Sequence, residues 1–101
     1  PAAKSPWKGN AHKKRRMTFK EKRELEDLIA EREALPARLD ALECEQHNLE
    51  ALLADPGLYA RDHAEFARIT VRLPQVEEEQ LELLERGDAL DARIAQLEAL
   101  K

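Results

Sequence analysis

Apolar residues recur along most of this chain at alternating intervals of three and four positions, the a/d heptad pattern of a coiled coil. One run covers residues 25–53 and is mostly Leu, and a second covers residues 66–97. The seam positions that carry other residues are Arg32, Gln46, Gln80 and Gly87. The pattern predicts two long amphipathic helices that pack along a single seam.

A turn signal separates the two runs at Asp55-Pro56-Gly57. Proline lacks the backbone N–H that a helix needs, and glycine tolerates turn geometry. Because a short connection makes consecutive helices antiparallel neighbours, we expect an all-α fold, an antiparallel two-helix coiled-coil hairpin over residues 18–101. Its parts are a helix at 18–54, a tip at 55–62 and a helix at 63–100.

Both predicted helix starts carry capping signals. In the string TFKE at 18–21, the threonine hydroxyl is spaced to accept from the N–H of Glu21 while the Glu21 carboxylate reaches back. Asp62 offers an acidic cap to the second helix, three residues before Glu65. The first cap places the basic string KKRR just before the first helix.

Two prolines fall inside the predicted helices, at Pro36 and Pro74. Each removes a helical hydrogen bond and collides with the carbonyl four residues earlier. We expect a kink near each, because the heptad register passes through both positions without a change of phase. If the first helix ended at Leu35 instead, the alternative would be a three-helix arrangement.

Polar seam residues weaken a coiled coil but fix its alignment. In an antiparallel pair an a position faces a d position, so facing residue numbers sum to about 115 or 122 in this hairpin. Arg32 then faces Leu83 or Leu90, close to Gly87 in either register. We expect the polar seam residues to select one alignment over slipped ones.

Charge divides the chain more sharply than its net charge of −4 suggests. Residues 1–23 carry nine Lys or Arg against the single Glu21, which gives +8 and leaves −12 for the rest. Pro, Gly, Ser and like charges without apolar periodicity predict a flexible basic arm over residues 1–17. Since the chain starts at Pro1 with this linker-like stretch, we expect a segment of a longer protein.

Motifs for enzymatic chemistry are missing from the sequence. No G-x-x-x-x-G-K-[ST] string for binding nucleotide phosphates and no G-x-S-x-G string for a nucleophile occur. The many carboxylates lie in helical patterns that bring no group of them together for acid/base work. We therefore predict that this segment is not an enzyme, uses no cofactor and binds no small-molecule substrate.

Cys44 and His47 sit three apart and face the same direction on a helix, yet two ligands are too few for a metal site without His63 or a symmetry mate. We predict no metal. A single cysteine forms no internal disulfide, and neither a signal peptide nor a membrane-spanning run is visible. These features predict a cytoplasmic protein that does not interact with membranes.

The basic arm is the strongest functional signal. Lys and Arg near phosphates release condensed counterions, and an aromatic ring between lysines can stack on an unpaired base. The arm therefore predicts DNA or RNA as a partner, although an acidic protein surface or mere solvation of a linker remain alternatives. The candidate nucleic-acid-binding residues are Lys8, Lys13, Lys14, Arg15, Arg16, Lys20, Arg23 and Trp7.

If the first helix extends backwards on binding, Lys13, Arg16, Lys20 and Arg23 follow a 3,4,3 spacing and form one cationic stripe. No base-reading motif is visible, so selectivity would be for shape or charge.

Four strings, MTFKEKRELE, ALPARLDALE, LLADPGLYARD and FARITVRL, resemble the C-terminal domain of ABC-F ATPases of the Uup type. The resemblance covers roughly residues 17–100. It implies a parent protein with two ATP-binding cassettes upstream, possible contact between these cassettes and this segment, and a C-terminal domain that contacts DNA or ribosomal RNA. The chain departs from the family at Gly87 and Pro74, and in the inserted string DLIAERE.

Three function classes follow. We favour a non-catalytic nucleic-acid-binding domain, and the alternatives are a protein-interaction or dimerisation coiled coil and an inert spacer that positions the ATPase. A polyanion partner predicts strong salt sensitivity, whereas a protein partner predicts salt-insensitive association. The apolar residues off the seam that such a partner would use are Leu52, Leu81, Leu84 and Leu100.

Overall fold

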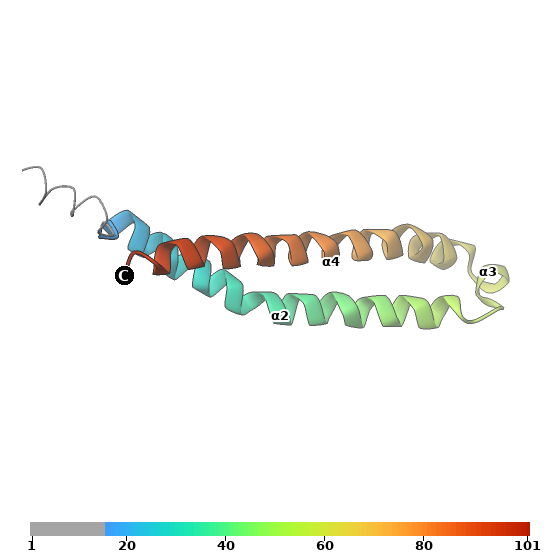
Figure 1. Cartoon of the computed structure of the whole chain (residues 1–101). Coiled ribbons are helices and arrows are strands. Elements are labelled where there is room, and N and C mark those ends of the chain that lie inside the picture. The colour runs from blue at the N-terminus through green and yellow to red at the C-terminus, as the bar shows by residue number, and fades with distance from the viewer. Residues whose placement is uncertain (1–15) are drawn as a thin grey trace, which may run out of the picture.

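The computed structural model describes residues 16–101. Helix α2 (Phe19–Leu53) and helix α4 (His63–Glu98) run antiparallel, joined by a tip that contains the short helix α3 (Leu58–Arg61) (Figure 1). At 1.5 Å per residue, a helix of the length of α4 extends about 54 Å. The predicted all-α hairpin is confirmed, with the added finding that part of the tip is helical.

The core is a single layer of side chains along the seam. The side chains with less than 2% of their surface exposed are Leu35, Ile69, Val76, Leu90 and Leu97. All of them occupy seam positions of the predicted heptads, which shows that burial follows the apolar pattern. Near the tip, Leu49, Leu58, Ile69 and Val76 form one cluster, against which neighbouring seam residues pack.

The two helices adopt the second of the two predicted registers. A Cβ atom added to Gly87 would lie 3.3 Å from Cδ1 of Leu35, so these residues face each other and their numbers sum to 122. Across the seam, the Gln80 side-chain amide donates to the Gln46 side-chain oxygen at 2.9 Å. The polar seam residues therefore satisfy one another in this alignment.

Both prolines lie within continuous helices, because α2 runs through Pro36 and α4 runs through Pro74. The alternative in which the first helix ends at Leu35 is therefore wrong. Both proline side chains are exposed, so their rings stay outside the seam. Figure 1 shows α2 changing direction in the stretch that includes Pro36, whereas α4 follows a nearly straight course.

Both predicted caps are present. The Thr18 hydroxyl accepts from the Glu21 N–H at 3.1 Å, and the Glu21 carboxylate accepts from the Thr18 N–H at 2.9 Å, which completes the capping box. The Asp62 carboxylate accepts from the Glu65 N–H at 3.0 Å. These contacts fix where α2 and α4 begin.

Three bidentate ion pairs join the helices along one side of the seam. Arg93 donates to Glu24, Arg86 to Glu31 and Arg72 to Glu45, with N–O distances of 2.6–2.9 Å. Arg72 also donates to Glu79 at 2.8 Å. We call this side the ladder edge; its residues are Glu24, Glu31, Glu45, Arg72, Glu79, Arg86 and Arg93.

Arginines of the ladder edge also lower the pKa values of three of its carboxylates. A hydrogen bond from Arg93 holds the pKa of Glu24 below its ordinary value, and Arg86 and Arg72 do the same for Glu31 and Glu45. Planar guanidinium groups match carboxylates in two-bond geometry, so each pair works only in one register. The ladder therefore reinforces the alignment that the seam residues select.

Candidate nucleic-acid interface

The predicted binding residues divide at the limit of the described structure. Arg16, Lys20 and Arg23 are described, and all three are exposed at the open end of the hairpin, where α2 begins and α4 ends. The others, Trp7, Lys8, Lys13, Lys14 and Arg15, lie outside the described residues.

The local fold explains how these cations are presented. Thr18 has extended backbone angles, φ −74° and ψ 166°, and α2 starts one residue later. Arg16 therefore precedes the helix, whereas Lys20 and Arg23, three residues apart, lie on one face of its first turns. Of the predicted cationic stripe, Lys20 and Arg23 are helical and Arg16 is not, while Lys13 lies outside the described residues.

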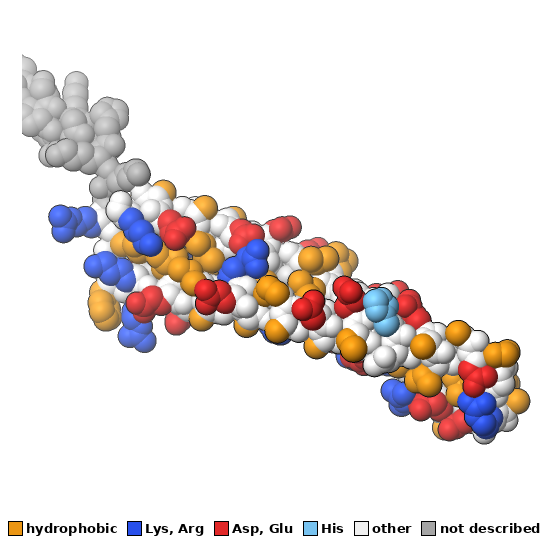
Figure 2. Space-filling model, turned by 90° about the horizontal axis from the view of Figure 1, so that it is seen from below, with side chains coloured by type: hydrophobic (Ala, Val, Ile, Leu, Met, Phe, Trp, Pro, Cys, Tyr) orange, Lys and Arg blue, Asp and Glu red, His pale blue; other side chains and the backbone are white. Residues whose placement is uncertain are grey.

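Two more cations join the same end. Lys22 is exposed in the first turns of α2, and Lys101 arrives from the far end of the sequence because the hairpin returns the chain to its starting point (Figure 1). Figure 2 shows several Lys and Arg side chains gathered where the rod adjoins the grey residues. Lys101 was missed by sequence reasoning, although the register with sum 122 places it opposite Glu21.

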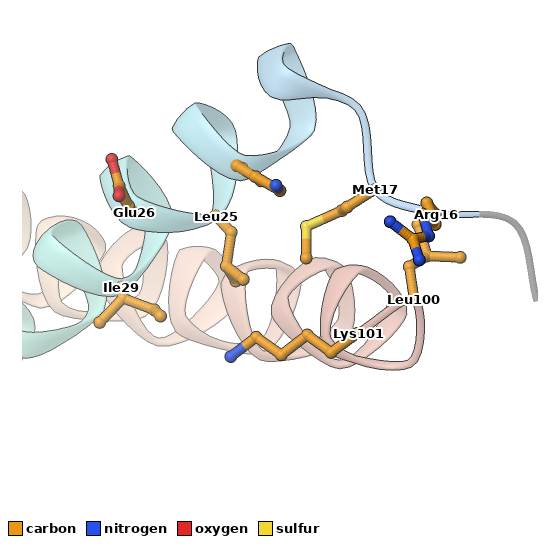
Figure 3. A pocket seen from close by; sticks show the side chains of 8 residues that line it. Arg16, Met17, Leu25, Glu26, Ile29, Leu100 and Lys101 are labelled. Atoms are coloured by element: carbon orange, nitrogen blue, oxygen red, sulfur yellow. The ribbon is translucent and has the colours of Figure 1, made fainter.

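An apolar hollow of about 620 Å³ opens among these cations. Met17 and Leu25 point toward α4 in Figure 3, and Arg16 lies close to Leu100 at the mouth. The lining residues are Arg16, Met17, Lys22, Leu25, Glu26, Ile29, Leu100 and Lys101. An apolar floor edged by three cations and the Glu26 carboxylate suits a flat base whose phosphate is held by the cations.

Three carboxylates at the open end are engaged by other groups. Glu21 belongs to the capping box, and Glu24 receives both hydrogen bonds from Arg93. Glu98 lies 3.6 Å from the Lys101 ammonium. Residues 16–24 carry four basic and two acidic side chains, and Glu26 and Asp27 on the next turn of α2 add two more carboxylates.

Phe19 adds an aromatic surface beside these cations. It is the first residue of α2, and 75% of its surface is exposed. The sequence analysis did not select Phe19 as a binding residue. An exposed ring between cations provides a stacking platform for an unpaired base.

The possible metal ligands do not converge. Within residues 16–101, no group of three or more His, Cys, Asp or Glu side chains is arranged to hold a metal ion. Cys44 is exposed on α2, and His63 lies at the tip, where its ring is 4.5 Å from that of Tyr59. Over the same residues, no helix combines the length and apolar character that a membrane crossing requires.

This hairpin matches one known protein family model. The family model described as ABC transporter C-terminal domain matches residues 16–86, from the basic end through most of α4. Neither the curated proteins nor the solved structures contain a match to the chain. The family match agrees with the resemblance seen in the sequence and ends just before Gly87. The chain therefore belongs to the ABC transporter C-terminal domain family.

Proposed function

We propose that this accessory domain, which is not itself the catalytic ATPase module, binds DNA or ribosomal RNA through its basic open end. The observation that carries the proposal is the gathering of Arg16, Lys20, Lys22, Arg23 and Lys101 at one end of an otherwise acidic rod. The predicted arm residues would extend this surface toward the N-terminus.

The charge distribution favours contact at one end. Lys20, Lys22 and Arg23 form no ion pair within residues 16–101, so they are available to phosphates. Farther along the rod, the excess of carboxylates repels a polyanion. A nucleic acid strand would therefore lie across the open end, with the tip pointing away from it.

Phe19 and the hollow support the same orientation. Both offer an apolar surface within the cationic cluster, which suits single-stranded or unpaired bases better than the outside of a duplex. In this proposal, the ATPase cassettes implied by the resemblance precede the open end. Nucleic acid bound there would lie close to them.

The test is binding of labelled DNA duplex, single-stranded DNA and structured RNA by the complete chain across a salt series. Micromolar binding that weakens steeply with salt is expected, because each neutralised phosphate adds about 0.9 to the magnitude of the log–log slope on duplex DNA. A matched pair of variants, Arg23→Gln and Arg38→Gln, distinguishes binding at the open end from binding at the middle of the rod. Both arginines are exposed on α2.

Arg23→Gln should weaken binding and lower the magnitude of the slope, while Arg38→Gln should leave both unchanged. Equal effects of the two variants would mean that positive charges contribute to nucleic-acid binding wherever they lie on the rod. Absence of binding even at low salt would overturn the proposal and leave the protein-interaction rod or the inert spacer.

A further inference from the structure

The side of the seam opposite the ladder edge is open and apolar. Two adjoining hollows of about 130 and 260 Å³ lie there, and both are lined by Leu39 and Leu84. We call this side the groove edge; the residues that define it here are Pro36, Leu39, Glu43, Leu84, Gly87 and Asp88.

Gly87 and the outward leucines create this shape. Gly87 faces Leu35 so closely that an added Cβ atom would lie 3.3 Å from Leu35 Cδ1, and both residues line the smaller hollow. Leu84 and Leu81 on the same part of α4 are each 56% exposed. Apolar side chains in water beside a hollow are typical of a surface that receives another side chain.

Charge distinguishes this edge from the ladder edge. Glu43, Glu77 and Asp88 are exposed and form no ion pair within residues 16–101, whereas every carboxylate of the ladder edge is bound by an arginine. Asp91 is the exception on the groove edge, since Arg32 donates to it at 2.6 Å. The groove therefore has an apolar floor and a rim of unneutralised carboxylates.

We propose that the groove edge is a docking surface for a basic amphipathic helix. An apolar side chain of the partner enters the hollow beside Gly87 and packs on Leu84, as in helix-in-groove recognition with anchors at i, i+3 and i+4. Lys or Arg residues flanking those anchors pair with Glu43 and Asp88. The result is a local three-helix bundle.

Charge complementarity sets this occupant apart from the others. A second copy docked through its own acidic rod would place carboxylates against Glu43 and Asp88, and a nucleic acid would bring phosphates to the same rim, so both are repelled. A basic helix gains ion pairs with the rim as well as burial of the exposed leucines. This surface is independent of the basic open end.

The test uses the complete chain and a labelled synthetic peptide of three heptads with Leu at a and d and Lys at e and g. Binding is measured by fluorescence anisotropy for wild type, Leu84→Gln and the control Val71→Gln. Val71 is 62% exposed on the same helix, away from both hollows. Leu84→Gln should weaken binding about tenfold, and Val71→Gln should leave it unchanged.

A second pair of variants tests whether the peptide pairs with the rim carboxylates specifically. The alternative is a general attraction between a polycation and an acidic rod. The double variant Glu43→Gln, Asp88→Asn should weaken binding more than Asp27→Asn, Glu78→Gln, although both remove the same charge. Circular dichroism checks that each variant keeps its helix content. Undetectable peptide binding by wild type, or equal losses within either pair, would overturn the proposal.

Discussion

The two ends of this hairpin are built from the same heptad pattern but differ in how their side chains are satisfied. At the tip, the Asp55 carboxylate accepts from the Gly57 N–H at 2.9 Å and from Arg61 at 2.7 Å, and Leu58 is buried in an apolar cluster. At the open end, a hollow replaces the cluster, and Phe19 is mostly exposed.

This difference separates stability from binding. Tip residues use their polar groups on one another, so the tip closes the seam and holds the two helices in register. The open end keeps cations and apolar surface accessible, while Leu25 and Leu97 are buried in its part of the seam.

The largest expected effect comes from removing core volume near the tip. Ile69→Ala should lower the free energy of unfolding by about 2–5 kcal/mol, since Ile69 is fully buried in the tip cluster. Leu100→Ala should cost less than about 1 kcal/mol, because this side chain already borders a hollow. Urea unfolding followed by circular dichroism measures both. Equal losses would contradict the stated difference between the ends.

Neutralising the open end should affect binding rather than folding. The triple variant Lys20→Gln, Lys22→Gln, Arg23→Gln should weaken nucleic-acid binding by about tenfold or more at low salt, with stability changed by less than about 0.5 kcal/mol. Arg61→Gln at the tip provides the contrast and should leave affinity unchanged, which the same binding titration checks. A loss of affinity from the tip variant would place the contact elsewhere.

The two helix caps should have similar effects at opposite ends. Thr18→Ala and Asp62→Ala should each cost about 1 kcal/mol, because each removes an acceptor for a backbone N–H at a helix start. Thr70→Ala, within α4, serves as a control with little expected change. Thermal unfolding compares the three; a negligible cost for Thr18→Ala would show that the start of α2 is already frayed.

The smallest effects concern carboxyl titration. Hydrogen bonds from Arg93 lower the pKa of Glu24, and hydrogen bonds from Arg61 and then the Gly57 N–H lower that of Asp55. Because both values are depressed in the folded state, the associated stability is present at neutral pH. It is lost as the pH falls below the ordinary carboxyl pKa and through the lowered values.

A pair of arginine variants tests which hydrogen bonds lower the pKa values of Glu24 and Asp55. Arg93→Gln should return the pKa of Glu24 toward its ordinary value, whereas Arg61→Gln should return that of Asp55 only partly, since the Gly57 N–H still donates. Carboxyl carbon shifts in an NMR pH titration measure both values. A full return of the Asp55 pKa to its ordinary value would mean that the hydrogen bond from the Gly57 N–H does little to lower it.

Much of the fold follows from local sequence signals. The seam pattern, the Asp55-Pro56-Gly57 turn and the two caps predict the hairpin, and the structure places the helix starts within one residue of the expected positions. The second helix ends at Glu98 rather than at residue 100, and α2 continues through Pro36. Exposed prolines at the outside of a helix interrupt a hydrogen bond without disturbing the seam.

Features that depend on the register were harder to predict. The seam alone left two alignments open, and the contact between Leu35 and Gly87 identifies one. That choice carries Lys101 to the start of α2, where it lines the same hollow as Met17.

The most direct test of the central claim is to map the bound nucleic acid onto the rod by NMR, with amide shifts followed during titration of a short DNA or RNA strand. The account predicts shifts concentrated in residues 16–25 and at Lys101, with the amides of the tip, 55–66, unchanged. Shifts concentrated at the tip or spread along the acidic rod, with the open end unaffected, would contradict it.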